Sequence, residues 1–303
     1  MLQYKKITLL FITSVLFSCH TVNKHGPQIS RHIDVHGHRG ARWVYPENTI
    51  PAFEYALQNH VDYIELDLGV TKDGVLIIVH DQTINPEICL DAQGKKPKSG
   101  ITIHSLTLKQ IKQYDCGSII NPRFPTQTVV PGTKIPTLQE FFDWINKSQH
   151  PHAKLVKFNI EIKSEESQPK LSPKPEVFTK KLITLLEKNK MLDRTIIQSF
   201  DFRTLKAARR IKPGVKISAL IEDRPTQKIQ DIALQLKANY ISPNYEWLTK
   251  EDIVQLHMID TLVAPWTVNQ KQDWKRLIDM GADAIITDNP KELVDYIKTL
   301  ETH

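Results

Sequence analysis

Three acidic residues in this sequence have a spacing that suits a metal ion. Glu65 and Asp67 are two residues apart in an apolar run, so in a strand their side chains point to the same side. Glu161 stands in a similar position in a later apolar run. Three carboxylates without a cysteine favour a hard divalent ion, Ca²⁺ or Mg²⁺. The alternative is that they pair with Arg39 and Lys163 in a network of salt bridges without a metal.

Two histidines complete a chemical set around these carboxylates. His38 follows one apolar run, and His80 follows a run that returns after an Asp-Gly turn at residues 73–74. The outgoing and returning segments are about equally long, so we expect His80 to lie beside the carboxylates and to face His38. Their reference pKa near neutrality suits general acid and base catalysis. Arg39 and Lys163 could neutralise a phosphodiester anion at the same place.

The elements that must position these residues alternate along the chain. The predicted strands are Ile33–His36, Tyr63–Leu68, Val75–Val79, Phe158–Ile162, Thr195–Ser199, Lys216–Ile221, Asn239–Ser242, Thr261–Trp266 and Ala284–Thr287. The predicted helices are Thr49–Asn59, Thr137–Ile145, Val177–Asn189, Phe202–Lys212, Gln227–Leu236, Thr249–Met258, Gln270–Met280 and Pro290–Leu300. Such alternation predicts a parallel sheet. The third run returns antiparallel after its turn, which leaves eight β/α units, the number in an α/β fold of the (β/α)₈ TIM-barrel type.

Length and composition fit one such domain. The 303 residues are 40% hydrophobic and 24% charged, which is ordinary globular usage. We expect a barrel over residues 32–303. A stretch from about 69 to 132, rich in Lys, Pro and Gly, predicts a subdomain inserted after strand two, and Ser164–Pro175 predicts an exposed loop near the barrel mouth. The net charge is +6, but the lysines are dispersed and no basic helix occurs, so nucleic acid is not a predicted partner.

The N-terminus has the pattern of an export signal. Two lysines precede Ile7–Phe17, an apolar and hydroxyl run too short to span a bilayer but typical of a signal peptide. The run ends in Leu-Phe-Ser-Cys, which resembles the lipobox of bacterial lipoproteins. We expect residues 1–19 to be the signal, Cys19 to be lipidated and 20–31 to be a flexible tether; a simple cleavable signal is the alternative. His20, in place of Asp, favours an outer-membrane anchor that faces the periplasm.

Cys89 and Cys116 are the remaining cysteines. In an oxidising periplasm they could form a disulfide. The sequence leaves this open, because it does not fix the distance between their Cα atoms.

Seven strings occur in a fixed order along the chain: HRGARWVYPENTIPAF, YIELDLGVTKDGVLIIVHD, IPTLQEFF, NIEIK, QSFDF, WTVN and IITDNP. As an ordered set they resemble the glycerophosphodiester phosphodiesterase family over about residues 33–295. The resemblance implies hydrolysis of a glycerophosphodiester to glycerol 3-phosphate and an alcohol. It also implies that the glycerol 2-hydroxyl attacks first and that water then opens a cyclic phosphate.

The same resemblance implies a role for each matching residue. Glu65, Asp67 and Glu161 would bind one divalent metal, and His38 and His80 would be the catalytic acid and base, in an order that the sequence does not give. The phosphate and the pocket would be contacted by Arg39, Lys163, Gln198, Phe200 and Trp266, and Asn48 would lie close to the metal.

Some features leave the pocket lining open. Residues 82–89 stand where many relatives have a leucine-rich segment, so the leaving-group side is undefined. Phe200 and Trp266 could be plain core residues. His36 lies on the same strand side as His38 and is either a spare ligand or a packing residue; we expect packing.

Two other functions compete with this interpretation. One is a lysophospholipase D-like or phospholipase C-like enzyme with a wider, more apolar mouth, which Trp43 and Tyr45 could line. The other is a surface lipoprotein that uses the barrel only for binding. The complete set of acid, base, ligand and phosphate positions argues against a pure binder. The predicted partners are therefore a small glycerophosphodiester and, through the anchor, a membrane.

Overall fold

The computed structural model describes residues 32–301, so the predicted signal peptide, Cys19 and the tether lie outside the described residues. The strands are β1 (Asp34–Gly37), β2 (Tyr63–Val70), β3 (Leu76–Ile78), β4 (Lys157–Ile162), β5 (Thr195–Ser199), β6 (Lys216–Ile221), β7 (Tyr240–Pro243), β8 (Leu262–Val263) and β9 (Ala284–Thr287). The α-helices are α1 (Ile50–Gln58), α2 (Leu108–Ile111), α3 (Leu138–Lys147), α4 (Pro175–Lys188), α5 (Phe202–Ile211), α6 (Ile229–Leu236), α7 (Lys250–His257), α8 (Lys271–Met280) and α9 (Pro290–Glu301). Three short 3₁₀ turns are η1 (Ile103–Ser105), η2 (Pro151–Lys154) and η3 (Leu192–Arg194).

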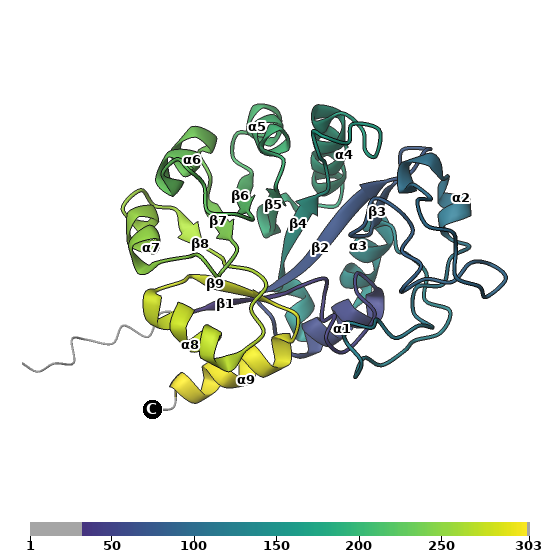
Figure 1. The fold of residues 1–303 in the computed structure, drawn as a ribbon, viewed down its shortest axis with the longest axis horizontal. Coiled ribbons are helices and arrows are strands. Elements are labelled where there is room, and N and C mark those ends of the chain that lie inside the picture. Colours follow the sequence, from purple (N-terminus) through teal and green to yellow (C-terminus); the bar gives the residue numbers. More distant parts are fainter. Residues whose placement is uncertain (1–31, 302–303) are drawn as a thin grey trace, which may run out of the picture. The chain divides into compact units, whose positions relative to one another are not determined.

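Eight parallel strands form a barrel, and the helices surround them (Figure 1). The strand order is β8-β7-β6-β5-β4-β2-β1-β9, and β3 pairs antiparallel with β2. Between β8 and β9 the backbone N–H of Asp283 donates to Val263 O (3.0 Å) and that of Ile286 to Pro265 O (3.0 Å). The sheet is therefore nearly closed, and the predicted (β/α)₈ barrel is confirmed.

The strands follow from their apolar sequences. All eight residues of β2, including the two carboxylates, are buried, because side chains face either the barrel interior or the surrounding helices. β8 is shorter than predicted: Pro265 has no N–H and interrupts the ladder, although Trp266 N still donates to Pro243 O (3.1 Å).

Helix α3 shows how the outer layer attaches to the barrel. Thr137 and Glu140 form the expected capping box, with each side chain bonded to the other's backbone N–H (Thr137 Oγ1 3.0 Å, Glu140 Oε2 2.7 Å). Phe141 packs edge-on against Phe53 of α1 at 5.0 Å and Phe158 of β4 at 5.3 Å between ring centroids. Among the described residues, no helix is both long and apolar enough to cross a membrane.

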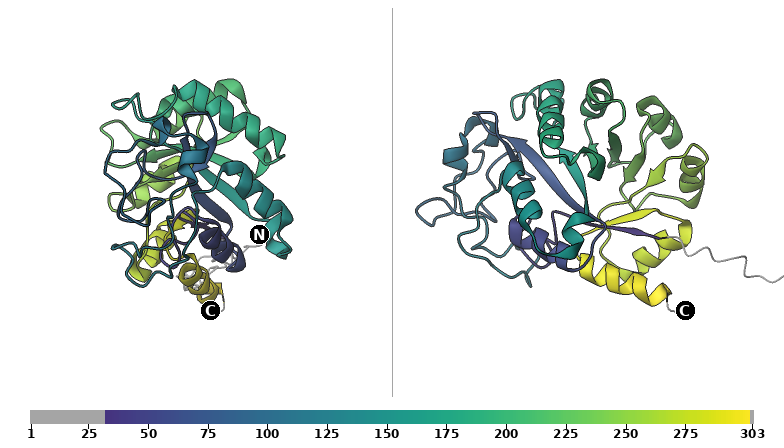
Figure 2. Two further views of the ribbon diagram at one scale, coloured as in Figure 1. Left: turned by 90° about the vertical axis from the view of Figure 1, so that its right-hand side faces the viewer. Right: turned by 180° about the vertical axis from the view of Figure 1, so that it is seen from behind.

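Residues 79–137 join β3 to α3 and lie to one side of the barrel (Figures 1 and 2). Their longest regular elements are η1 and α2, and α2 has a Thr107–Gln110 capping box that the sequence analysis did not identify. Cys89 and Cys116 form a disulfide at 2.02 Å within a small apolar cluster. The pairing that the sequence left open is thus present in the structure.

Helix α4 begins at Pro175, two residues before the predicted start and on the last residue of the predicted loop. Proline suits the first helical turn, because the N–H that it lacks has no partner within the helix. The 3₁₀ turns and α2 were not predicted, since elements of three or four residues carry too little periodicity to be recognised.

Candidate active site

The three predicted carboxylates lie together at the C-terminal end of two neighbouring strands. β2 and β4 are parallel and in register, with Asp67 opposite Glu161, and Glu65 is two residues earlier on the same side of β2. One oxygen from each lies within 4.8 Å of the others. All three side chains are buried. The strand register therefore builds an acidic centre at the end of the barrel where active sites of this fold lie.

The electrostatics of this centre are unfavourable without a further cation. Burial and the neighbouring Asp67 raise the pKa of Glu65 well above its ordinary value. Burial raises the pKa of Glu161, although Lys163 opposes the shift. Burial would also raise the pKa of Asp67, but Lys163, His80 and Arg39 lower it well below the ordinary value. Asp67 Oδ1 is buried without a hydrogen bond. Three oxygen ligands and an orphaned carboxylate oxygen fit a hard divalent ion.

Neutral donors hold two of the carboxylates in place. Asn48 Nδ2 donates to Asp67 Oδ2 at 2.8 Å. Gln198 Nε2 donates to Glu65 Oε1 at 2.8 Å, and the backbone N–H of Arg39 donates to Glu65 Oε2 at 2.7 Å. The structure thus places Asn48 and Gln198 against the acidic centre, where their amides fix the orientation of the carboxylates.

The tight turn after β1 depends on two glycines. A Cβ at residue 37 would lie 2.3 Å from the carbonyl oxygen of Gly40. A Cβ at residue 40, whose φ is +84°, would lie 2.7 Å from the backbone of Ala52 in α1. Because the turn is this compact, the Arg39 N–H reaches Glu65.

Both predicted phosphate-binding cations contact carboxylates. Arg39 Nη1 lies 2.6 Å from Glu47 and its Nε 3.4 Å from Asp67. Lys163 Nζ lies 2.8 Å from Glu161 and 3.6 Å from Asp67. Burial would lower the pKa of Lys163, but these two carboxylates raise it. The salt-bridge network posed as an alternative to a metal therefore exists for two of the three acidic residues.

His38 is held by a carboxylate from the far end of the sequence. Its Nδ1 lies 2.6 Å from Asp288 Oδ1, and its side chain is 13% exposed against 2% for Asp288. Burial lowers the pKa of His38 to about 4, against the effect of Asp288. Burial would raise the pKa of Asp288, but His38 and Arg42 lower it to about 2. An ionised carboxylate only accepts, so Nδ1 carries the proton and Nε2 of the neutral ring keeps its lone pair.

His80 has a similar partner in a more open place. Its Nδ1 lies 2.7 Å from Asp81 Oδ1, and the two side chains are 31% and 36% exposed. Asn85 Nδ2 donates to Asp81 Oδ2 at 2.8 Å. Asp81 and Asp288 were not predicted as histidine partners, although Asp81 follows His80 directly and Asp288 follows β9 within the string IITDNP.

His36 lies deeper in the barrel than the acidic centre and is fully buried. Its ring stacks at 4.2 Å on Tyr63, and its Nδ1 lies 3.2 Å from Asn159 Nδ2. Burial lowers its pKa to about 3. It does not belong to the carboxylate group that could hold a metal, so its position is that of a packing residue.

A pocket of about 320 Å³ opens over this centre. The predicted site residues that line it are His38, Arg39, Glu65, His80, Glu161, Lys163, Gln198, Phe200 and Trp266. The charged lining residues that the sequence analysis did not single out are Arg42, Arg123, Glu246 and Asp288. Asp67 and Asn48 lie behind the lining, against the other ligands.

The aromatic lining differs in part from the prediction. Phe200 is 40% exposed and packs edge-to-face on Trp266 at 5.4 Å, so these two form a wall of the pocket and are not core residues. Trp266 Nε1 donates to Ser242 O at 2.8 Å. Trp43 and Tyr45 do not line the pocket: they pack on Phe124 and Tyr55, at 5.7 and 5.6 Å, because the chain turns away from the mouth after residue 42.

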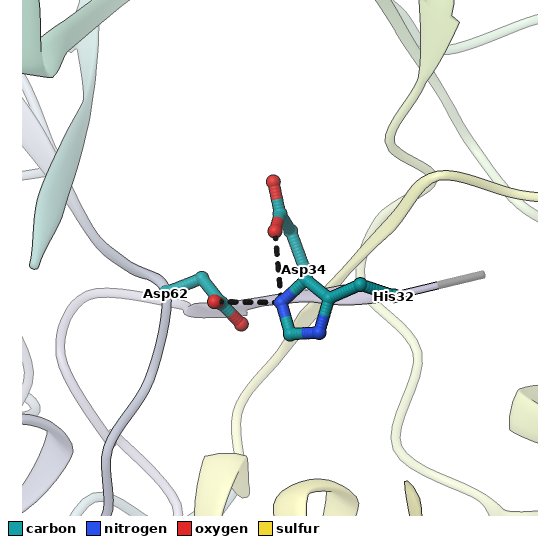
Figure 3. A group of neighbouring side chains, drawn as sticks. All are labelled: His32, Asp34 and Asp62. Carbon is teal, nitrogen blue, oxygen red and sulfur yellow. Dashed lines mark hydrogen bonds and ion pairs between the residues drawn. The ribbon is translucent and has the colours of Figure 1, made fainter. Parts of the chain in front are cut away.

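A second group of potential ligands lies at the N-terminal ends of β1 and β2 (Figure 3). His32 Nε2 lies 3.2 Å from Asp34 and 2.9 Å from Asp62. Asp62 also accepts the backbone N–H of Val35 at 2.9 Å. These contacts join β1 to the loop before β2, at the end of the barrel where residues serve stability.

Known proteins resemble this chain over most of its length. The family model described as "Glycerophosphoryl diester phosphodiesterase family" matches residues 38–292. A protein of Bacillus subtilis (strain 168) named "Glycerophosphodiester phosphodiesterase" is 32% identical over 265 residues, which cover 84% of this chain and 82% of that protein. A crystal structure from Silicibacter pomeroyi DSS-3 has a TM-score of 0.83 at 26% identity and covers 89% of this chain and 95% of its own. A phosphodiesterase from Oleispira antarctica, in complex with the product sn-glycerol-3-phosphate, has a TM-score of 0.72 at 21% identity, with 88% and 96% covered.

Proposed function

The chain belongs to the glycerophosphoryl diester phosphodiesterase family and is an enzyme of that class, and from this premise we propose that it cleaves glycerophosphodiesters by metal-dependent His/His catalysis. The product is glycerol 3-phosphate, the compound bound by the Oleispira antarctica neighbour. The observation that carries the proposal is the convergence of two carboxylate-held histidines on one buried group of three acidic residues.

His38 is the general base in this proposal. Its ring is neutral near pH 7 because partial burial lowers its pKa, and Asp288 holds the proton on Nδ1, so Nε2 can take the proton of the glycerol 2-hydroxyl. The freed alkoxide attacks phosphorus, the bond from phosphorus to the alcohol oxygen breaks, and a cyclic phosphate forms. Asp288 stabilises the imidazolium that develops, as a buried carboxylate does beside a catalytic histidine.

His80 is the general acid. It lies close enough to Asp67 and Glu161 to lower the pKa that burial raises in each, and it is more exposed than His38. Contact with solvent allows it to be reprotonated after it has given its proton to the leaving alcohol. In the second step the roles reverse: His80 takes a proton from water, water opens the cyclic phosphate, and His38 returns its proton to the 2-oxygen.

Glu65, Asp67 and Glu161 would hold the divalent ion, with Ca²⁺ or Mg²⁺ the species that three oxygen ligands favour. When bound, such an ion polarises phosphoryl oxygens and stabilises the charge that develops on them. Arg39 and Lys163 lie against the same carboxylates, so they keep the group compact and present positive charge to the phosphate.

The test is release of glycerol 3-phosphate from glycerophosphocholine by protein treated with chelator, with Ca²⁺, Mg²⁺ or Zn²⁺ added back in turn. We expect one metal to restore the wild type and none to restore Glu65→Ala. Equal activity of wild type and His38→Ala would refute the acid–base assignment. Faster hydrolysis of lysophosphatidylcholine would instead favour the lysophospholipase D-like alternative, for which Trp43 and Tyr45 provide no apolar mouth.

We further propose that residues 69–132 act as an inserted subdomain. We also propose that the enzyme is exported and anchored through Cys19 in the outer membrane, facing the periplasm. The lipobox-like sequence and the Cys89–Cys116 disulfide, which needs an oxidising compartment, support the export. Metabolic labelling with palmitate tests the anchor: label is expected in the wild type and absent from Cys19→Ser.

A further inference from the structure

Four cations line the pocket, and three of them already have carboxylate partners. Arg39 pairs with Glu47 and Lys163 with Glu161. Arg42 Nε lies 2.8 Å from Asp288. Arg123, the fourth, has no ion pair within residues 32–301, and its side chain is exposed on the pocket rim. It is therefore the one of these four cations whose charge is not shared with a carboxylate among the described residues.

The backbone that carries Arg123 is fixed to the catalytic face. Gln127 Nε2 donates to the carbonyl oxygens of Arg42 (2.5 Å) and Tyr45 (2.9 Å). The guanidinium of Arg42 lies 4.8 Å above the ring of Phe124, the residue next to Arg123. A side chain mounted on an anchored loop loses less freedom when it binds than one on a mobile loop.

The loop is also close to the machinery of His38. The ring of Phe124, the residue next to Arg123, lies under the guanidinium of Arg42, and Gln127 of the same loop bonds the Arg42 carbonyl oxygen. Burial and Arg39 lower the pKa of Arg42, and Arg123 adds to this shift. Arg42 in turn contacts Asp288, the partner of His38. Arg123 thus stands on the His38 side of the pocket, where the proposed function puts the glycerol phosphate part of the substrate.

The sum of the charges around the pocket also points to Arg123 as a ligand of the phosphate. The carboxylates in this network are Glu47, Glu65, Asp67, Glu161 and Asp288, and the paired cations are Arg39, Arg42 and Lys163. Together with one divalent ion these groups are neutral, so a phosphodiester anion adds an uncompensated negative charge. Arg123 can supply the matching positive charge. Glu246, which is exposed on the loop after β7, also has no ion pair within residues 32–301.

We propose that Arg123 binds the phosphate group of the substrate and of glycerol 3-phosphate, and so determines affinity in the reaction proposed above, on which this inference rests. A guanidinium can make two parallel hydrogen bonds to a phosphate, whereas an ammonium acts as a point charge. The contact is present in substrate and product alike, so it contributes to KM and to product affinity more than to kcat.

The experiment compares wild type, Arg123→Gln, Arg123→Lys and Thr126→Glu. Thr126→Glu is the control, because residue 126 is exposed on the same loop outside the pocket lining and the exchange alters the net charge by the same amount. The readouts are kcat and KM for glycerophosphocholine and glycerophosphoglycerol, and the Kd of glycerol 3-phosphate by calorimetry. For Arg123→Gln we expect KM and Kd to rise about tenfold, as for loss of a charge-assisted hydrogen bond. Arg123→Lys should be intermediate and Thr126→Glu close to wild type.

KM and Kd within twofold of wild type in Arg123→Gln would overturn the inference. Glycerophosphoserine, whose alcohol carries a carboxylate, is assayed in parallel. A loss confined to this substrate would also overturn the inference and assign Arg123 to the alcohol. An equal loss of affinity in Thr126→Glu would also overturn the inference, because it would show that the net charge of the loop, and not a contact of Arg123 with the phosphate, determines the affinity. If the wild type releases no glycerol 3-phosphate, the proposed function fails, and the calorimetric Kd still tests the contact.

Discussion

Exchange of Asp288 for asparagine removes a charge without removing an acceptor. The carboxylate lies 2.6 Å from His38 Nδ1 and 2.8 Å from Arg42 Nε, and it accepts from Asn269 Nδ2 at 2.7 Å. An asparagine oxygen can still accept from the histidine, so the orientation of the ring can be kept. What is lost is the negative charge beside the imidazolium that forms when His38 takes a proton.

The expected loss follows from the strength of that contact. A hydrogen bond to a charged group contributes about 1.5–3 kcal/mol. Because the contact strengthens when the ring becomes charged, we expect kcat to fall by roughly 10- to 150-fold with KM nearly unchanged. The pKa of His38 is about 4 and Asp288 raises it, so the exchange lowers it further. His38 is then neutral above pH 6 in both proteins, and the loss should be the same from pH 6 to 9.

The assay is release of glycerol 3-phosphate at saturating substrate and metal, with unfolding followed by circular dichroism. Asp283→Asn is the matched control: Asp283 also flanks β9 and bonds a histidine, His257 Nε2 at 2.8 Å, but at the other end of the barrel. Both variants should have a lower Tm, since each loses a buried charge partner. A kcat of Asp288→Asn within threefold of wild type, in a folded protein, would refute the role of Asp288.

Three other perturbations test the site and its support. Glu65→Gln should lower the affinity for the activating metal by at least tenfold, and metal should raise the Tm of wild type but not of the variant, as differential scanning calorimetry can show. Burial lowers the pKa of His36 from 6.5 to about 3, so its contribution to stability is complete above pH 6.5 and is lost as the pH falls toward 3, by roughly 4–5 kcal/mol. In His36→Gln, the free energy of unfolding measured with urea should therefore change less between pH 7 and pH 4 than in the wild type. The Cys89–Cys116 loop spans 27 residues, so Cys89→Ala/Cys116→Ala should lose about 3–4 kcal/mol, and hydrogen exchange should locate the loss in residues 79–137. Unchanged metal affinity in Glu65→Gln would contradict the first prediction, and an unchanged pH dependence of unfolding in His36→Gln the second. Unchanged hydrogen exchange in the cysteine double variant would contradict the third.

The part of the site that the sequence predicted is the part that strand geometry determines. Alternation along β2 puts Glu65 and Asp67 on one side, and the pairing of neighbouring parallel strands brings Glu161 beside them. The Asp-Gly turn fixed the hairpin, and in the structure Val79 N donates to Asp67 O at 3.0 Å, so His80 returns to the level of the carboxylates.

The partner of His38 could not be predicted without the closed barrel. His38 and Asp288 are 250 residues apart and meet because β1 and β9 are neighbours, with Gly37 opposite Thr287. No local pattern gives that register. The place of Arg123 in the pocket could not be predicted for a different reason. The loop that carries Arg123 has no periodic element, and the path of this loop depends on the hydrogen bonds of Gln127 to the segment after β1.

Glu65 differs from the other two acidic residues in a way that bears on the two alternatives that the sequence left open for the acidic centre. The salt bridges of Arg39 and Lys163 reach Asp67 and Glu161, but Glu65 has no ion pair within the described residues. Its two oxygens instead accept from N–H groups, one from the Arg39 backbone and one from the Gln198 amide. The Arg39 N–H opposes the rise in the pKa of Glu65 that burial and Asp67 cause, but the pKa stays well above its ordinary value. A buried ionised carboxylate with no paired cation is costly. The network of salt bridges therefore accounts for two of the three acidic residues, and the third favours a metal ion.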